Sequence, residues 1–336
     1  MTTRIVDPND TEYTQTEDPA LRPRNLDEYI GQSAVVDNLK VYIQAAKKRG
    51  DAMDHVLLAG PPGLGKTSLA HIIAEELGVE IRPTSGPILE RGGDLAAILN
   101  SLQPREVLFI DEIHRMNRAV EEVLYSAMED FRIDVMLGQG PGAQSVSLPL
   151  PPFTLIGATT RAGLLTRPLR DRFQIQFQME FYQPEELSVI ITKSAERLGV
   201  SLTPDASLEL AKRSRGTPRV ANRMLRRARD FAQVEGDGTI TLDLTKFALE
   251  RLGIDEVGLD STDRKILHTI ADKFDGGPVG LNNLSTALGE ESDTISEKYE
   301  PFLIMKGFMQ RTQQGRVITA RGRQHINYKA GQGKLF

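Results

Sequence analysis

Short apolar runs alternate with amphipathic segments through the first half of the chain. Three runs are almost wholly apolar, which is typical of buried parallel strands: His55 to Ala59, Val107 to Ile110 and Phe153 to Ala158. Between them, apolar residues repeat at helical spacing from Lys66 to Leu77 and from Val120 to Phe131. Strands that alternate with helices predict a parallel sheet covered on both faces. We therefore expect one large α/β domain over residues 21–182.

The pattern changes twice in the second half. Residues 183–257 contain only helical patterns, which predict a small helical domain. Beyond residue 258, three helical segments precede two short strand-like segments that flank Gln313, Gln314 and Gly315. Helices followed by such a hairpin predict a winged helix over residues 258–336. Residues 1–20 are polar and lack periodicity, so we expect a flexible arm.

Composition excludes several classes of protein. The 336 residues include no cysteine, which excludes a disulfide scaffold and a cysteine-ligated metal site. The five histidines do not have the spacing of a metal site. No apolar stretch approaches 18 residues, and the N-terminus is polar and acidic. We expect a soluble, cytoplasmic protein without a membrane partner.

The net charge of −5 is unevenly distributed. Residues 211–229 contain eight Lys or Arg and no acid, and residues 301–336 contain seven and no acid. Such runs are usually solvated faces, and contact with nucleic acid is the alternative. The second run falls in the predicted winged helix, which favours DNA there.

Residues 60–67, GPPGLGKT, match the phosphate-binding P-loop pattern. The pattern lies between a predicted strand and a predicted helix, as the motif requires. Glycines allow backbone N–H groups to surround phosphates at a helix N-terminus. Lys66 would then neutralise the β and γ oxygens of ATP, and the Thr67 hydroxyl would bind Mg²⁺.

Polar residues follow two other predicted strands. Asp111 and Glu112 end one strand, where Asp111 can hold the Mg²⁺ shell and Glu112 can polarise the attacking water. Without the P-loop, two such acids would more often be a solvated strand end. Thr159 or Thr160 ends the next strand and can sense the γ-phosphate, with a turn or capping role as the alternative.

Two arginines have positions that suggest contact with phosphate. Arg172 can stabilise transition-state charge, including charge on a neighbouring subunit's nucleotide. Surface pairing with Asp171 is the alternative. Arg219 lies in the first turn of a predicted helix, where a cation is disfavoured unless an anion binds nearby.

Together these residues resemble the AAA+ ATPases and, among them, the RuvB family of branch-migration motors. The resemblance extends from Leu21 over nearly the whole chain. Besides the P-loop, it rests on these segments: Leu21 to Pro23, Leu108 to Arg115, Gly157 to Gly163, Pro168 to Phe173 and Gly216 to Arg219. The uninterrupted segment from Pro151 to Gly163 and the terminal winged helix are more specific than the P-loop.

The resemblance implies a homohexameric ring that uses ATP and Mg²⁺ to migrate four-way DNA junctions with RuvA, in recombination and repair, with RuvC as a further partner. It implies catalytic roles for Asp111, Glu112, Thr159 and Arg172, with Arg172 as arginine finger, and Mg²⁺ ligation by Thr67 and Asp111. The implied nucleotide contacts are Leu21, Arg22, Gly63, Gly65, Lys66, Thr67, Ser68, Glu129, Asp130, Phe131, Tyr182 and, as second sensor, Arg219. The implied contacts with the DNA backbone are Arg311 and Arg316.

The resemblance also identifies residues 133–150 as the hairpin that docks on RuvA. Two positions depart from the family's pattern. Ser292 stands where related sequences often have a DNA-binding arginine, and Gln174 replaces a glycine after Arg172 and Phe173.

Other AAA+ functions remain as alternatives. A protein remodeller would need an aromatic pore loop, and residues 84–100 contain no aromatic residue. A clamp loader or a nucleotide-dependent initiator would share the ATPase core. The winged helix, which supplies a DNA contact within the same chain, weakens the clamp-loader alternative.

Overall fold

The computed structural model describes residues 19–137 and 144–327. The chain forms two compact units. Residues 1–59, 65–178 and 193–199 make up the first unit, and residues 60–64, 179–192 and 200–336 make up the second. The described ranges contain no helix that is long and apolar enough to cross a membrane.

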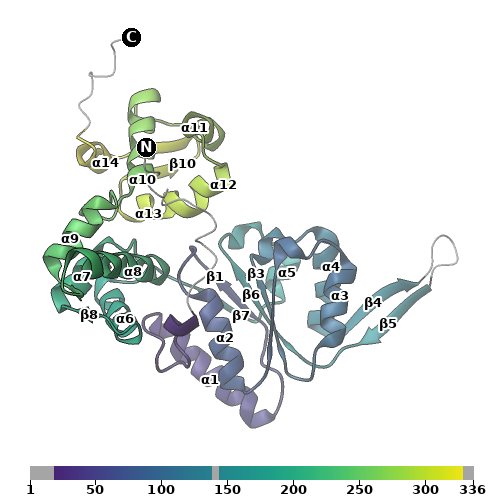
Figure 1. Cartoon of the computed structure of the whole chain (residues 1–336). Coiled ribbons are helices and arrows are strands. Elements are labelled where there is room, and N and C mark those ends of the chain that lie inside the picture. Colours follow the sequence, from purple (N-terminus) through teal and green to yellow (C-terminus); the bar gives the residue numbers. More distant parts are fainter. Residues whose placement is uncertain (1–18, 138–143, 328–336) are drawn as a thin grey trace, which may run out of the picture. The chain divides into compact units, whose positions relative to one another are not determined.

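The first unit is built on a five-stranded parallel sheet with strand order β2-β3-β6-β1-β7 (Figure 1). Its strands are β1 (Val56–Ala59), β2 (Ile81–Ser85), β3 (Val107–Asp111), β6 (Thr154–Thr159) and β7 (Ile175–Gln178). Because all five strands are parallel, their carboxyl ends lie at one edge of the sheet and their amino ends at the other. The predicted α/β class with a parallel sheet is confirmed.

Helices cover both faces of this sheet. They are α1 (Ser33–Arg49), α2 (Lys66–Leu77), α3 (Gly92–Ser101), α4 (Arg118–Asp130) and α5 (Arg167–Asp171). Leu57, Leu108 and Leu155 point to one face, where they share an apolar cluster with residues of α3 and α4. Helix α2 packs on the other face, against β3 and β6, and α1 packs against α2 (Figure 1). Because side chains alternate between the two faces along each strand, one set of apolar residues packs against α3 and α4 and the other set faces α2.

An antiparallel hairpin extends from the same unit. Its strands are β4 (Arg132–Leu137) and β5 (Gln144–Pro149), and Val135 pairs with Val146 (Figure 1). The hairpin expected within residues 133–150 is confirmed as a strand pair. Its expected turn, residues 138–143, lies outside the described residues, as do residues 1–18 of the expected arm.

The second unit contains a helical part and a winged helix. The helical part comprises α7 (Pro204–Arg213), α8 (Pro218–Glu235), α9 (Leu242–Arg251), the short strands β8 (Ser201–Leu202) and β9 (Thr239–Ile240), and the first residues of α6 (Pro184–Arg197). Thr217 caps α8, because its hydroxyl accepts a hydrogen bond from Val220 N at 3.4 Å. Pro218 follows in the first helical turn, where its missing N–H is not needed.

The winged helix has its own core. Its elements are α10 (Ser261–His268), α11 (Leu281–Leu288), α12 (Ser292–Thr294), α13 (Glu300–Met305), β10 (Met309–Thr312), β11 (Gly315–Ile318) and α14 (Ala320–His325), with π-helical turns at Thr269–Lys273 and Ile295–Tyr299. Strands β10 and β11 pair antiparallel around Gln313 and Gln314. Buried side chains from the helices and the hairpin form one apolar cluster. The predicted winged helix is therefore confirmed.

A buried ion pair joins the helical part to the winged helix within the second unit. Arg215, which precedes the Thr217 cap, donates two hydrogen bonds to the Asp263 carboxylate, at 2.8 and 3.2 Å. Its guanidinium also lies 4.5 Å from the ring centre of Phe302. Burial raises the pKa of Asp263 to about 7, against the opposing effect of Arg215.

Candidate active site and DNA-binding arginines

The P-loop lysine begins α2 directly after the carboxyl edge of the sheet. Gly65 precedes it with φ of 93°, a conformation that favours glycine. A Cβ atom on Gly65 would lie 2.9 Å from the Tyr29 hydroxyl, so there is no room for a side chain. Lys66 and Ser68 are buried, and Thr67 occupies the same first turn. This backbone has the form of a phosphate cradle.

The first half of the P-loop, residues 60–64, packs against later segments of the second unit. A Cβ atom on Gly63 would lie 3.1 Å from Arg219 Cβ. Arg219 N donates to Gly63 O at 3.4 Å, and the Tyr182 hydroxyl donates to Leu64 O at 3.4 Å. Tyr182 N also bonds Gly216 O at 2.9 Å. The predicted second sensor therefore begins a helix that touches the phosphate loop.

The acidic pair lies at the same edge of the sheet as Lys66. Asp111 is the last residue of β3, and its Oδ1 atom accepts from Glu112 N at 2.9 Å. Glu112 has φ of 48°, which directs the chain away from the strand. A Cβ atom on Gly86 would lie 2.3 Å from Glu112 O, so only glycine fits beside this peptide. The two carboxylates thus have different backbone conformations.

The structure gives the two candidate threonines different partners. The Thr160 hydroxyl donates to Glu112 Oε2 at 3.2 Å. Thr159 is fully buried, and its hydroxyl lies 3.0 Å from His114 Nδ1 and accepts from Arg161 N at 3.0 Å. Thr159 thus has the turn contact considered as its alternative role, and only Thr160 bonds the acid directly.

His114 is a member of this cluster that the sequence reasoning missed. Its Nδ1 atom lies 3.2 Å from Glu112 Oε2 as well as 3.0 Å from the Thr159 hydroxyl. An Nδ1 lone pair would repel the carboxylate, so we assign a hydrogen to this nitrogen. The only signal in the sequence was a histidine three residues after Asp111.

Leu21 and Arg22 lie beside α2. Leu21, in the 3-10 turn Pro19–Leu21, is buried, and its carbonyl accepts from Arg197 Nη1 at 3.1 Å. Burial, together with the nearby charge of Arg22, lowers the pKa of His71 in α2. The segment predicted to contact nucleotide therefore packs beside the helix that Lys66 begins.

Arg172 lies at the other edge of the sheet. It follows α5 and precedes the amino end of β7 by three residues. Its Nη2 atom donates to Glu129 Oε2 at 2.8 Å, and its guanidinium lies 4.6 Å from the ring centre of Tyr125. Asp171 pairs with Arg167 instead, at 3.4 Å, so the alternative pairing of Arg172 with Asp171 is wrong. Gln174, the unusual residue nearby, accepts from His55 N at 3.2 Å.

The three residues predicted to line a nucleotide pocket lie near Arg172. Glu129 pairs with Arg172, and Asp130 pairs with Arg132 at 3.3 Å. The Phe131 ring packs against His55 and Phe153, with centroids 6.3 and 5.9 Å away. His55 and Phe153 precede the amino ends of β1 and β6, so this group lies away from the P-loop of its own chain.

The two wing arginines face each other across the hairpin and converge on one acid. Arg311 and Arg316 are register partners, and both pair with the carboxylate of Glu300 at the start of α13. Glu300 is 0% exposed, Arg316 is 13% exposed and Arg311 is 53% exposed. The resemblance implies DNA contacts for both arginines, and the structure leaves mainly Arg311 accessible. Ser292, the other unusual position, bonds Ser285 Oγ at 3.1 Å.

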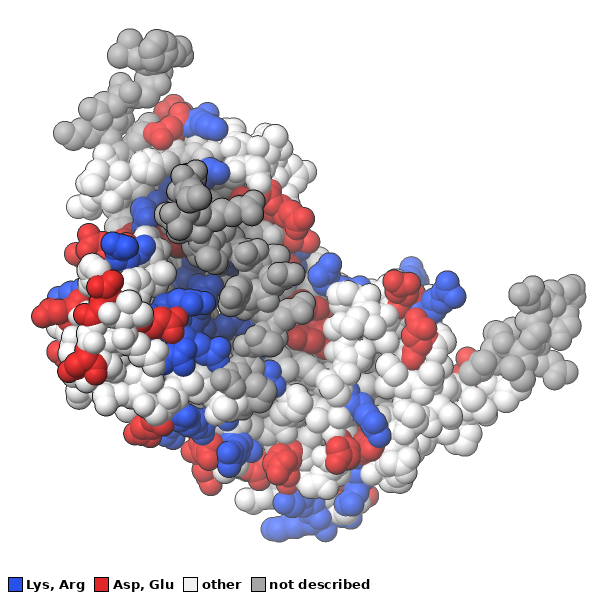
Figure 2. Space-filling view, viewed as in Figure 1, with Lys and Arg blue, Asp and Glu red and all other residues white. Residues whose placement is uncertain are grey.

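On the face drawn in Figure 2, Lys and Arg side chains gather over the second unit, where α8 contains Arg219, Arg223, Arg226, Arg227 and Arg229.

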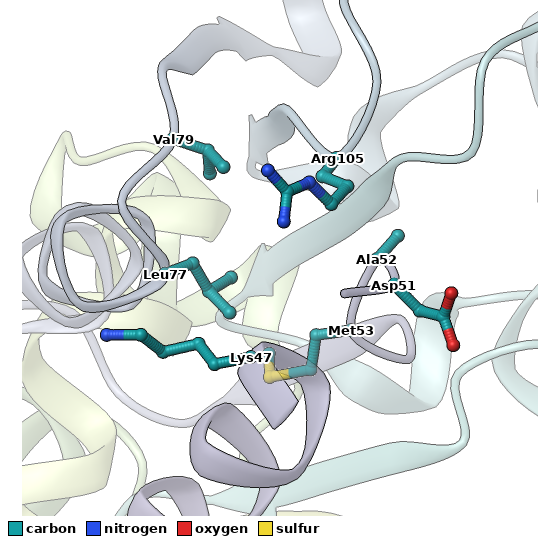
Figure 3. A pocket seen from close by; sticks show the side chains of 7 residues that line it. All are labelled: Lys47, Asp51, Ala52, Met53, Leu77, Val79 and Arg105. Atoms are coloured by element: carbon teal, nitrogen blue, oxygen red, sulfur yellow. The ribbon is translucent and has the colours of Figure 1, made fainter. Parts of the chain in front are cut away.

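A hollow of about 10 Å³ lies in the first unit between Lys47, Leu77 and Arg105 (Figure 3). It could hold one water molecule and is too small for a nucleotide.

Family models cover almost all of the described chain. The P-loop domain of the Holliday junction DNA helicase RuvB matches residues 21–179, the RuvB AAA lid domain matches residues 182–255, and the RuvB C-terminal winged helix domain matches residues 256–327.

Individual relatives agree with these matches. The Holliday junction branch migration complex subunit RuvB of Myxococcus xanthus is 61% identical over 320 residues, which are 94% of this chain and 93% of that protein. The Thermotoga maritima RuvB Holliday junction branch migration motor has 52% identity and a TM-score of 0.85, covering 92% of this chain and 99% of that one. An alanine-to-serine variant of the same protein has a TM-score of 0.87 at 52% identity and the same coverage. The chain therefore belongs to the RuvB family of AAA+ P-loop ATPases.

Proposed function

We propose that this chain is the ATP-driven motor that migrates four-way DNA junctions by moving duplex arms independently of their sequence. The observation that carries the proposal is the combination of two sites in one chain. Lys66, Asp111 and Glu112 gather at one edge of a parallel sheet, and a winged helix presents the paired arginines Arg311 and Arg316. Arginine contacts to phosphate give grip without reading sequence, as a translocating motor requires.

The residues at the carboxyl edge fit Mg·ATP. Gly60, Gly63 and Gly65 all have positive φ, which leaves the loop backbone open to phosphate oxygens. Within residues 19–137 and 144–327, no three acidic or histidine side chains gather into a metal cluster. That suits Mg²⁺, which is usually held by one or two protein ligands together with the phosphates of the substrate. Thr67 and Asp111 would be those ligands.

Each residue at this edge has a separable role. Lys66 and the Ser68 turn bind the phosphates, and Glu112 orients and polarises the attacking water. Thr160 and His114 hold the Glu112 carboxylate, and Thr159 acts on it through His114. Leu21, Arg22, Tyr182 and Arg219 complete the nucleotide contacts of the same subunit.

Arg172 and residues 129–131 act on the neighbouring subunit in a homohexameric ring. They lie at the amino edge, whereas Lys66 lies at the carboxyl edge, so they cannot serve the P-loop of their own chain without a large rearrangement. A ring supplies the missing partner, because each subunit presents this edge to the next. Arg172 would be the arginine finger of the adjacent ATP site.

The protein would act in the cytoplasm with RuvA and with RuvC at the same junction. The β4–β5 hairpin would dock on RuvA, and residues 21–182, 183–257 and 258–336 would be the functional domains, after an arm of residues 1–20. Shortening the hairpin turn should abolish RuvA binding and leave ATP binding intact. Normal capture by RuvA in a pull-down at equal concentration would contradict this role.

A synthetic four-way junction tests the proposed function. Wild type with RuvA should dissociate it in the presence of ATP, and Glu112→Gln should bind Mg·ATP but hydrolyse and migrate far more slowly, because it keeps the ligands and loses the base. Lys66→Ala should lose ATP binding itself. Turnover by Glu112→Gln at the wild-type rate would exclude Glu112 as the catalytic base.

The same assay separates the alternatives. A clamp loader or initiator would hydrolyse ATP on DNA without dissociating the junction, and an initiator would prefer one sequence. Equal stimulation of ATPase activity by random duplexes, with junction dissociation, favours the motor.

A further inference from the structure

The finger helix α5 is attached to α4 at both ends. Glu121, Tyr125 and Glu129 are four residues apart on α4, so they form one stripe on that helix. Thr166, the N-cap of α5, donates to Glu121 Oε2 at 2.8 Å. Arg172, the C-cap of α5, donates to Glu129 at 2.8 Å. The stripe therefore fixes the start and the end of a helix of only five residues.

Tyr125 lies in the middle of this arrangement. Its hydroxyl donates to Glu121 Oε2 at 3.0 Å and lies 3.1 Å from the Thr166 hydroxyl. Its ring faces the Arg172 guanidinium, whose carbon is 4.6 Å from the ring centre. Burial raises the pKa of Tyr125, so the phenol remains protonated and continues to donate. The ring is thereby fixed by its polar end and leaves a flat surface for the guanidinium.

The contacts of Arg172 differ in how easily they can be exchanged. The Glu129 side chain is 55% exposed, and such a pair contributes little to stability. A phosphate on the next subunit can therefore replace Glu129. The Tyr125 ring and the carbonyl of Pro168, which accepts from Arg172 Nη1 at 2.7 Å, need not move when it does.

From this geometry we propose that Tyr125, held by Glu121 and Thr166, is a positioning residue for Arg172. Its ring sets the plane and direction of the Arg172 guanidinium. Arg172 then exchanges Glu129 for the γ-phosphate bound to the neighbouring subunit without sampling other rotamers. The inference rests on the proposed role of Arg172 as an arginine finger and adds a residue that orients its guanidinium. Catalysis is sensitive to this kind of alignment.

Steady-state ATPase kinetics of the full-length protein on DNA test the proposal. Tyr125→Leu should lower kcat by about tenfold to hundredfold, the cost of a misplaced catalytic group, with KM for ATP unchanged. Tyr125→Phe keeps the ring and should lose about fivefold, the size expected from one hydrogen bond. Tyr42→Leu, on an exposed tyrosine of α1, is the matched control and should retain wild-type kcat.

Two further measurements distinguish an effect of Tyr125 on the orientation of Arg172 from a general structural role of Tyr125. Because Tyr125 acts through Arg172, the double variant Tyr125→Leu, Arg172→Ala should be no slower than Arg172→Ala alone. Mixing Tyr125→Leu subunits with Lys66→Ala subunits, which keep an intact stripe, should restore turnover at the intact P-loops. A misfolded P-loop in the Tyr125→Leu subunit would show no such recovery.

The outcomes distinguish this inference from the function on which it rests. Full activity of Arg172→Ala would remove the finger itself and the inference with it. An inactive Arg172→Ala with a normal Tyr125→Leu would overturn only the role of Tyr125. An additive loss in the double variant, or no recovery in rings shown to be mixed, would also overturn it. Because Tyr125→Phe is nearly isosteric, its kcat decides the question even if Tyr125→Leu does not fold.

Discussion

Arg172, the proposed arginine finger, and the two wing arginines are each held by a glutamate, but the two glutamates differ in burial. Glu129, which holds Arg172, is 55% exposed, whereas Glu300, which holds Arg311 and Arg316, is 0% exposed. Exposed pairs contribute about 0–1 kcal/mol, and breaking a buried pair by removing one partner costs about 3–5 kcal/mol. The first pair can therefore be exchanged, while the second is a fixed part of the fold.

This difference matches what each site is proposed to do. The finger has to leave its own glutamate whenever a neighbouring γ-phosphate is present and return to it after hydrolysis. The wing has to hold its arginines in one place against any DNA sequence, and the buried Glu300 carboxylate provides a fixed partner for them. One carboxylate shared by two arginines leaves the group with a net charge of +1 when all three are ionised, which still attracts phosphate.

The largest effect that tests this comparison is expected from Arg172→Ala. Loss of an arginine finger lowers kcat by about 10³-fold to 10⁵-fold, while ATP binding should persist because Lys66 and the loop are untouched. Single-turnover hydrolysis and nucleotide binding measured on the same preparation check both parts. An excess of Lys66→Ala subunits should restore some turnover, since they supply fingers to intact P-loops. No recovery in rings shown to be mixed would exclude action of Arg172 on the neighbouring subunit's nucleotide.

The next effect concerns stability. Glu300→Ala should reduce the stability of the winged helix by about 3–5 kcal/mol, because it leaves Arg316 largely buried without its acid. Glu129→Ala should change stability by about 1 kcal/mol or less. Hydrogen exchange under native conditions resolves the two, since it reports each unit separately. Equal protection losses in the two variants would remove the distinction between exchangeable and fixed pairs.

The sequence predicted the elements that are strongly patterned. The helix over residues 66–77 has the predicted bounds, because Gly78 ends it. Strand β2 was not predicted, since Ile81–Ser85 contains a proline and has no fully buried position. Helix α1 was missed because exposed Val41 and Tyr42 blur its apolar periodicity and its start has no side-chain cap. Elements at the periphery of the sheet carry the weakest pattern, and their burial depends on partners distant in sequence.

The residues of the candidate site divide in the same way, into those with a local sequence pattern and those whose contacts come from distant parts of the chain. Lys66, Asp111 and Glu112 could be predicted because they lie within short motifs at the ends of strands. His114, Tyr125 and Glu300 could not, because each acquires its role from contacts made in the folded chain. The Thr159–His114 contact joins residues 45 positions apart, and Glu300 meets Arg316 across 16. No local pattern records such pairings, because they form only when strands and helices distant in sequence pack together.

The smallest effect separates the two wing arginines. Arg311 is 53% exposed, so Arg311→Ala should weaken DNA binding equally for all sequences and reduce the slope of log affinity against log salt by about one. Arg316→Ala should reduce that slope less, because this side chain is directed to Glu300, and it should instead loosen the hairpin. DNA-independent ATP hydrolysis should persist in both variants, since the P-loop and the acidic pair are unchanged. Salt titrations on a junction and on random duplexes measure the slopes. If Arg316→Ala lowered the slope by one while Arg311→Ala had no effect, pairing with buried Glu300 would not determine which arginine contacts the phosphate. The contrast with the exchangeable pair of Arg172 and Glu129 would then be unfounded.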